Sequence, residues 1–494
     1  MGRIAFRQIP MTWRVPGVNV EFDWTAANRG LVRSLQRLLI MALHPGGGFP
    51  AALDTPILIE SYDHAVQLAG RASMLAQMVK TAKAANRVNE MWAILVAAPD
   101  AGVAAHGSVT FAGPASAAGT VPLLVDGRLI QVGVAANATA ATIATATVAA
   151  INADPDLAVT AAVDGVDSAR VNITCDWKGV TGNGIDLRVG YWRGLLLPSG
   201  VTATIAAFAG GTGVPDLADA IDALATRQYH HVVTPFTDAV SLAAAAEEME
   251  RRWDAMVQME GQVWTAAKGS LGTLTTLGTG LNSDALSVIG IGKSPTNPWI
   301  AAAAYGAACA KALGIDPARQ LRGIELKDVL PPEEVDQLAD EDRNILLYKG
   351  IATCTPTVDG QMLIERAVTS YQTNVAGLPD PSRLDVMTVA VASAMRETLR
   401  NYVTSHFPDY KLADDGTNWA PTQRVMTPKL FRGHVIHVAR LWEEVAWVES
   451  VDAWKDEIAV ERPKDTDPNR LDTFLPPDII NNAMEFAFLV QPRI

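Results

Sequence analysis

The sequence predicts a multi-domain α/β protein, and three observations lead to this fold class. Residues 25–100 and 213–456 alternate strand-like apolar runs with amphipathic helix-like runs, as α/β folds do. Residues 101–212 between them read as a β-rich inserted domain. Both ends of the chain alternate apolar and polar residues with a period of two, which predicts extended β-strand arms. A chain of 494 residues is long enough for roughly two to four domains.

The first element is an N-terminal arm, residues 1–24, in which prolines interrupt the chain. Within it, GVNVEFDW (17–24) alternates apolar and polar residues and predicts a strand with one apolar face. That face consists of Val18, Val20, Phe22 and Trp24. Because no turn signal or second strand lies beside it, we expect this strand to pair elsewhere.

Residues 25–100 form the first part of the expected core domain. SYDHAVQLAGRASMLAQMVKTAKAAN (61–86) predicts one long amphipathic helix. MWAILVAAP (91–99) is a continuous apolar run, as expected of a strand buried on both faces.

The composition changes in the insert, residues 101–212, which hold seven Asp, no Glu and five Lys or Arg. Strand-like runs there are joined by DG, NG and GG turns. LLVDGRLI (123–130) predicts a hairpin with a two-residue turn at Asp126–Gly127. Residues 139–157 predict one helix.

Residues 213–456 continue the core and include a C-terminal inner region. PWIAAAAYGAACAKAL (298–313) predicts a helix, and NILLYKGIATCTPT (344–357) a hairpin. Two further long helices are expected at 382–407 and 427–448.

The C-terminal arm, residues 457–494, mirrors the N-terminal one. EIAVERP (457–463) predicts a short strand, 465–478 a proline-punctuated connector, and AMEFAFLVQPRI (483–494) a strand of period two. Their apolar residues are Ile458, Val460, Met484, Phe486, Phe488 and Val490. Neither strand has an obvious local partner, so we expect both arms to pair with strands elsewhere.

Composition excludes several classes of protein. A net charge of −13 and an isoelectric point near 5.1 disfavour nucleic-acid binding, which needs a basic surface. Three cysteines do not make a disulfide framework and fit a reducing compartment. No signal-peptide pattern and no run of the ~20 apolar residues needed for a membrane span is present. We expect a protein that is cytosolic when made.

The glycine turn FAGGTGVPDL (208–217) has the place of a nucleotide loop, between a strand and a helix. As a dinucleotide fingerprint, however, it puts Asp216 where a third Gly or Ala is needed. Asp216 favours a helix start but repels a phosphate, and no Lys-Ser or Lys-Thr follows. We therefore interpret the turn as the return from the insert into a core helix. A nucleotide-binding α/β enzyme, with its site at 210–216, is the distant alternative.

No other pattern predicts catalysis or a metal. His230 and His231 are adjacent in a strand and point to opposite faces. His434 and His437 could share a helix face, but HVIH lacks the HExxH pattern. No G-x-S-x-G motif occurs. We predict no enzyme, catalytic residue, cofactor or metal.

Four segments resemble phage contractile-tail sheath proteins, in particular their Mu-like branch. They are RVPGVNVEFDWT (14–25), FAGGTGVPDL (208–217), LWEEVAWVESVDAWKDEIAVER (441–462) and DPNRLDTFLPPDIINNAMEFAFLVQPRI (467–494). The resemblance runs from residue 4 to residue 494 and is weakest in the insert, which varies among such proteins.

The resemblance implies a core of subtilisin-like topology without the catalytic triad. It also implies a homo-oligomer of stacked hexameric rings in a six-fold helical lattice around the tail tube protein. The arms would add strands to neighbouring subunits, and the insert would project outward. Baseplate and tail terminator proteins are the other implied partners. The sheath would assemble in the host cytoplasm, belong to the virion, and contract to drive the tube through the host envelope for genome ejection. A tailocin or related contractile injection system is the alternative.

Overall fold

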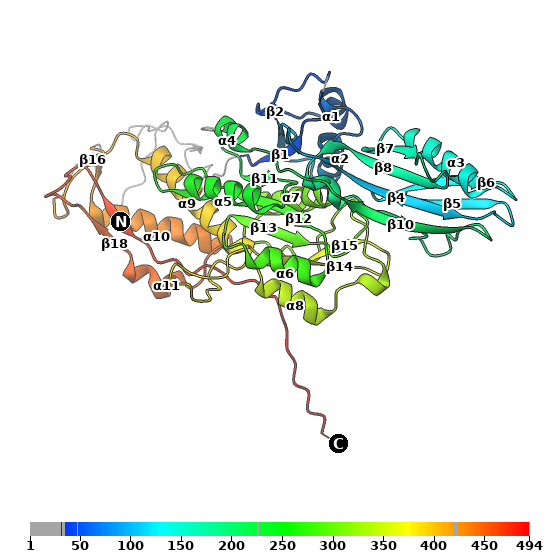
Figure 1. Cartoon of the computed structure of the whole chain (residues 1–494). Coiled ribbons are helices and arrows are strands. Elements are labelled where there is room, and N and C mark those ends of the chain that lie inside the picture. The colour runs from blue at the N-terminus through cyan, green and yellow to red at the C-terminus, as the bar shows by residue number, and fades with distance from the viewer. Residues whose placement is uncertain (1–30, 32–34, 47, 225–226, 418–422, 494) are drawn as a thin grey trace, which may run out of the picture. The chain divides into compact units, whose positions relative to one another are not determined.

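The computed structural model describes residues 31, 35–46, 48–224, 227–417 and 423–493. The chain divides into two compact units (Figure 1). The larger unit contains Leu35–Ser393 and the C-terminal segment from Ile480 onward. The described part of the smaller unit lies within Ala394–Ile479.

The centre of the larger unit is an eight-stranded sheet of order β15-β14-β13-β12-β11-β1-β3-β2. Its strands are β1 (Arg37–Leu43), β2 (Ile57–Leu58), β3 (Glu90–Val96), β11 (His231–Val233), β12 (Gln262–Ala267), β13 (Leu286–Gly290), β14 (Ile351–Pro356) and β15 (Met362–Arg366). The six inner strands are parallel, and the edge strands β2 and β15 are antiparallel to their neighbours. Every residue of β12 and β13 is buried, so both sheet faces are covered there. The predicted α/β class is confirmed.

Helices cover this sheet. They are α1 (Tyr62–Ala69), α2 (Met74–Ala85), α4 (Ala218–Leu224), α5 (Ala239–Trp253), α6 (Leu271–Thr279), α7 (Pro298–Ile315) and α8 (Asp340–Tyr348). The alanine-rich α7 begins with proline, which suits a first helical turn, and packs on β11, β12 and α2. Its Gly306 lies so close to the sheet that a Cβ atom would be 2.4 Å from Val233 Cγ2. Small residues therefore set how closely α7 approaches the strands.

The single helix predicted over 61–86 is wrong, because the chain forms two helices there. Gly70 ends α1 with a φ of 86°, a left-handed value that glycine adopts without strain. Ser73 then begins α2 by accepting a hydrogen bond from the Ala76 N–H at 3.1 Å. Because the helical spacing of apolar residues continues across Gly70–Ser73, the sequence pattern gave no sign of the break between the two helices.

The hairpin predicted at 344–357 is also wrong. Residues up to Tyr348 belong to α8, and only β14 is a strand. Asp342 accepts a hydrogen bond from the Ala339 N–H at 3.3 Å at the helix start, and Leu346 is buried. Gly350, with a φ of 66°, then turns the chain into β14. The apolar run ILLY fits the period of a helix as well as that of a strand, and the capping interaction at the helix start favours the helix.

Residues 104–209 contain two antiparallel sheets, of order β10-β4-β8-β7 and β6-β5-β9. The elements are β4 (Ala104–Ala112), β5 (Gly119–Val125), β6 (Arg128–Val134), α3 (Ala140–Asn152), β7 (Val159–Val163), β8 (Arg170–Lys178), β9 (Leu187–Val189) and β10 (Thr202–Ala209). The turn between β5 and β6 confirms the predicted two-residue hairpin, since Asp126 (φ 55°) and Gly127 (φ 72°) both adopt positive φ.

The smaller unit contains mostly helices. Its elements, with α9 running into it from the larger unit, are α9 (Val386–His406), β16 (Lys411–Leu412), β17 (Val425–Met426), α10 (Pro428–Glu444), α11 (Val451–Trp454), β18 (Ala459–Glu461) and β19 (Asp472–Phe474). The buried indole of Trp442 donates a hydrogen bond to Thr398 Oγ1 at 3.0 Å and joins α10 to α9. Arg432 Nε donates to the Ile458 carbonyl at 2.8 Å and fixes the approach to β18.

The structure corrects the expectation that strand 457–463 lacks a local partner. β18 pairs antiparallel with β19, with Val460 opposite Thr473. β19 lies inside 465–478, which the sequence predicted as a connector without strands. Prolines at both ends of LDTF concealed this short strand.

Among the described residues, no helix combines the length and the apolar character that a membrane crossing requires.

Candidate subunit interface

Met484 fixes the root of the C-terminal segment on its own chain. Its sulfur accepts a hydrogen bond from Gln320 Nε2 at 2.7 Å, and its carbonyl accepts one from Arg322 Nη1 at 3.2 Å. The side chain is partly buried against the core of the larger unit. These contacts anchor Met484 within its own chain, and its predicted contact with another subunit stays a prediction.

Beyond Met484 the segment leaves the larger unit as an extended trace (Figure 1). Phe486, Phe488 and Val490 are 75%, 85% and 79% exposed. Within the described part of the chain, no hydrogen bond involves the backbone of residues 485–493. A row of apolar side chains and a row of free backbone groups therefore face solvent together, which is unfavourable for an isolated chain.

The other predicted arm residues lie in different surroundings. Ile458 is 2% exposed and belongs to the interior of the smaller unit, and Val460 is half-buried in β18. In this conformation neither is available as a free strand. Val18, Val20, Phe22 and Trp24 lie outside the described residues.

The β18–β19 hairpin offers strand edges. Within the described residues the two strands form a sheet of their own, with no third strand beside either of them. Such a pair is marginally stable alone and exposes unpaired N–H and C=O groups along both edges. Phe474, 59% exposed at the end of β19, adds an apolar side chain. Sequence reasoning missed Phe474, although the adjacent strand formers Thr473 and Phe474 were a usable signal.

Ion pairs fix the loop of this hairpin. Asp414 accepts hydrogen bonds from Arg462 Nη1 at 3.2 Å and Lys464 Nζ at 2.5 Å. The Lys464 hydrogen bond is the main reason that the pKa of Asp414 lies below its usual value. Since Asp414 belongs to the loop after β16, the hairpin is attached to the rest of the smaller unit at a second point.

In the glycine turn at 208–217, backbone N–H groups that could bind a phosphate already donate hydrogen bonds within the chain. The Gly211 N–H donates to Asn183 Oδ1 at 2.8 Å. The Thr212 N–H donates to the Val103 carbonyl at 3.1 Å. These contacts support the interpretation of the turn as a structural return.

The cavity beside the glycine turn is acidic, and Asp54, Asp216 and Asp219 line it. Burial raises the pKa of Asp54, and the carboxylates of Asp219 and Asp216 raise it further. A negatively charged ligand would meet repulsion here, which argues against the nucleotide-binding alternative.

The paired histidines lie in structural contacts. His231 is buried, accepts a hydrogen bond from Trp264 Nε1 at 3.2 Å, and shares another with Gln36 Oε1 at 2.7 Å. His434 Nδ1 lies 3.0 Å from the Tyr402 hydroxyl, while His437 is exposed. Across the described ranges, no group of three His, Cys, Asp or Glu could hold a metal ion.

The cysteines Cys175, Cys309 and Cys354 are all free and buried. Burial raises the pKa of Cys175 and of Cys354 to about 12, which keeps these thiols protonated and unreactive at neutral pH.

Comparison with solved structures finds several similar chains. A sheath tail protein from Desulfitobacterium hafniense is 13% identical with a TM-score of 0.47, over 90% of this chain and 93% of that one. A sheath tail protein from Listeria innocua is 10% identical with a TM-score of 0.47, over 93% and 95%. A chain of the anti-feeding prophage baseplate is 10% identical with a TM-score of 0.46, over 98% and 100%.

Comparison of sequences identifies the family. Residues 210–370 match the central domain of phage tail sheath proteins. The Mu-like prophage FluMu tail sheath protein of Haemophilus influenzae is 34% identical over 488 residues, which is 99% of both chains. With this identity over nearly its whole length, the chain belongs to the phage tail sheath proteins, in their Mu-like branch.

Proposed function

We propose that this chain is the subunit of a contractile tail sheath that polymerises as stacked hexameric rings around the tail tube. Contraction of the sheath drives the tube through the host envelope for genome ejection. The observation that carries the proposal is the C-terminal arm, in which exposed apolar residues follow the Met484 anchor and the backbone groups have no partner among the described residues. The described part of a single subunit leaves these backbone groups unpaired, and strand pairing in a polymer would satisfy them.

The arm completes its hydrogen bonds by adding a strand to a neighbouring subunit. Strand addition pairs the backbone of residues 485–493 with a sheet edge, and the alternation of Phe486, Phe488 and Val490 fixes the register. The β18–β19 hairpin is the acceptor that we favour, because both its edges are free among the described residues. The N-terminal arm, residues 1–24, makes the reciprocal link.

Burial of surface supplies the work of contraction. The sheath assembles in an extended, metastable lattice, and a baseplate signal releases it into a shorter, wider lattice with larger contacts. Each additional Å² of apolar surface that is buried contributes roughly 25 cal/mol as an upper figure, summed over many copies. Linked arms keep neighbours attached while the cores, which have the proposed subtilisin-like topology without a triad, move past one another. Residues 101–212 project outward.

Two truncations test this function. Deletion of residues 485–494 removes the free arm but keeps Met484 and its anchor, and deletion of 1–22 removes the other arm. We expect each purified chain to remain folded, as judged by circular dichroism, yet to form no contractile sheath in negative-stain images. Intact sheaths that contract normally from either truncated chain would disprove the linking role.

A further inference from the structure

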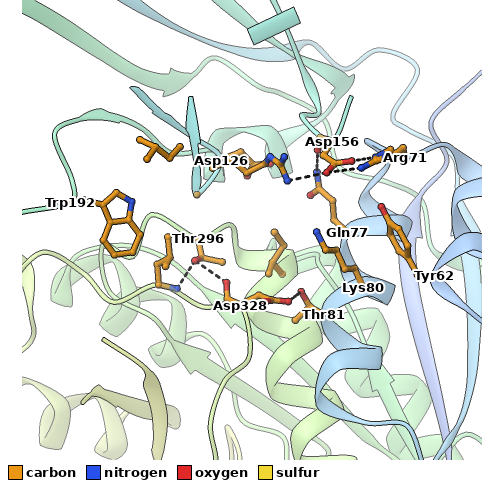
Figure 2. Close-up of a pocket in the computed structure, with 15 residues that line it drawn as sticks. Tyr62, Arg71, Gln77, Lys80, Thr81, Asp126, Asp156, Trp192, Thr296 and Asp328 are labelled. Atoms are coloured by element: carbon orange, nitrogen blue, oxygen red, sulfur yellow. Dashed lines mark hydrogen bonds and ion pairs between the residues drawn. The ribbon is translucent and has the colours of Figure 1, made fainter. Parts of the chain in front are cut away.

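A groove of about 330 Å³ lies in the larger unit where the β5–β6 hairpin meets α1 and α2 (Figure 2). This volume is within the range of small-molecule sites, which often lie between subdomains. Figure 2 shows Trp192 at one end of the groove and Tyr62 at the other. The Trp192 side chain is 42% exposed, so part of its ring surface is available to a ligand.

Ion pairs fix the polar wall of this groove. Arg128 contacts Asp154 at 2.9 Å and Asp156 at 3.1 Å, and Arg71 also pairs with Asp156. The hydrogen bond from Arg71 is the main reason that the pKa of Asp156 lies below its usual value. Because the charges compensate one another, the wall offers rigid hydrogen-bonding groups with little net charge.

The opposite wall is similar in character. Thr81 Oγ1 donates a hydrogen bond to Asp328 Oδ2 at 2.8 Å, which leaves the remaining capacity of the Asp328 carboxylate for another donor. Lys80 adds one ammonium group at the rim.

The innermost polar group is Asp126 at the hairpin turn. Its side chain is 4% exposed, and within the described residues its Oδ1 atom has no hydrogen-bond partner. Burial raises the pKa of Asp126 to about 8, against the opposing effect of Lys268, so the carboxyl is largely protonated at neutral pH. The floor of the groove therefore has a neutral carboxyl group whose Oδ1 atom is unpaired among the described residues, while Gln77 hydrogen-bonds the same carboxyl group.

We propose that this groove is a carbohydrate-binding site that takes a neutral sugar ring. The flat indole of Trp192 covers the apolar face of the ring, while Asp328, Arg128 and Asp126 hydrogen-bond its hydroxyl groups. A site of compensated charges favours a neutral polyhydroxylated ligand, because buried hydrogen-bonding groups are satisfied without a charge being transferred from water. This activity goes beyond the sheath function and does not depend on it.

Ligand-observed saturation-transfer NMR on the full-length protein tests the proposal. The probes are galactose, glucose and N-acetylglucosamine, with glucuronate and inorganic phosphate as the charged comparison. We expect saturation transfer to at least one neutral sugar. We expect Trp192→Ala to weaken that binding at least tenfold and Trp192→Phe to restore most of it.

Two further variants complete the design. Asp328→Asn keeps a residue that tolerates the local φ of 62° and should weaken binding severalfold. Tyr348→Ala, a change at a 79% exposed residue of α8 that does not line the groove, should leave binding unchanged. The proposal is overturned if no neutral sugar binds, if phosphate or glucuronate alone binds, or if a folded Trp192→Ala variant binds sugar as the wild type does.

Discussion

Replacement of Phe486 and Phe488, two exposed aromatic residues of the C-terminal arm, with alanine should strongly weaken assembly without affecting the fold. Phe486 and Phe488 are 75% and 85% exposed in the single subunit, so replacing both with alanine removes almost no packing there. Complete burial of one such side chain contributes about 1.5–3 kcal/mol. Because most of each ring is still available for burial, we expect the two side chains together to contribute roughly 3–4 kcal/mol to the free energy of association at each subunit junction.

This magnitude is large enough to measure. Since 1.4 kcal/mol corresponds to a factor of ten, the double variant should raise the critical concentration for polymerisation by roughly 100- to 1,000-fold. Centrifugal pelleting over a concentration series gives that value directly, and negative-stain images identify the pelleted species. Thermal unfolding of the unassembled chain should match the wild type within a degree or two.

A matched control tests the alternation itself. Leu489 is 90% exposed but lies on the other face of a period-two strand from Phe488. Leu489→Ala should therefore raise the critical concentration much less than either phenylalanine change. Polymerisation of the double variant at the wild-type concentration, or equal effects from Leu489→Ala, would refute the argument that a registered strand docks through this face.

Three further outcomes follow from the structure. Burial, and then the neighbouring His437 and His406, lower the pKa of His434, so the unfolded chain binds this proton more tightly than the folded one. Thermal melts should therefore show stability falling as the pH drops below about 6.5, and His434→Gln should flatten that dependence. Burial raises the pKa of Asp126 to about 8, so stability should decrease as the pH rises from about 4 to 8, and urea unfolding of Asp126→Asn should lack this component. Gly306→Ala should destabilise the protein by about 1–3 kcal/mol in denaturant titrations despite alanine's better helix propensity; an unchanged midpoint would contradict the close α7–sheet contact.

Local chemistry made parts of the fold predictable from the sequence. The pair Asp126–Gly127 tolerates the two positive φ angles of a primed turn, and it lies there as predicted. The continuous apolar run 91–99 predicted a buried strand, and β3 occupies Glu90–Val96. In both cases the residue pattern and the tertiary environment favour the same conformation.

The errors arose where two conformations satisfied the same pattern. ILLY at 345–348 fits both a strand and a helix, and the capping interaction at Asp342 selected the helix. Around Gly70 the spacing of apolar residues continues, although Gly70 adopts a positive φ of 86° that ends the helix. The C-terminal arm shows a further limit. The alternation predicted a strand over 483–494, but the described residues there form none; Phe486 and Phe488 are exposed, and nothing in the pattern indicated that Met484 binds its own core.

The anchor at Met484 also determines the reach of the arm. Among the described residues, 485–493 follow Met484 without a backbone hydrogen bond, and a fully extended stretch of that length spans roughly 30 Å. In the proposed strand exchange, the length of the arm sets the largest separation between the two paired subunits. Beyond that separation, either the backbone hydrogen bonds of the arm or the Met484 contact would break. Under the proposed strand exchange, the position of the Met484 anchor would therefore limit how far neighbouring subunits can slide while these residues stay paired.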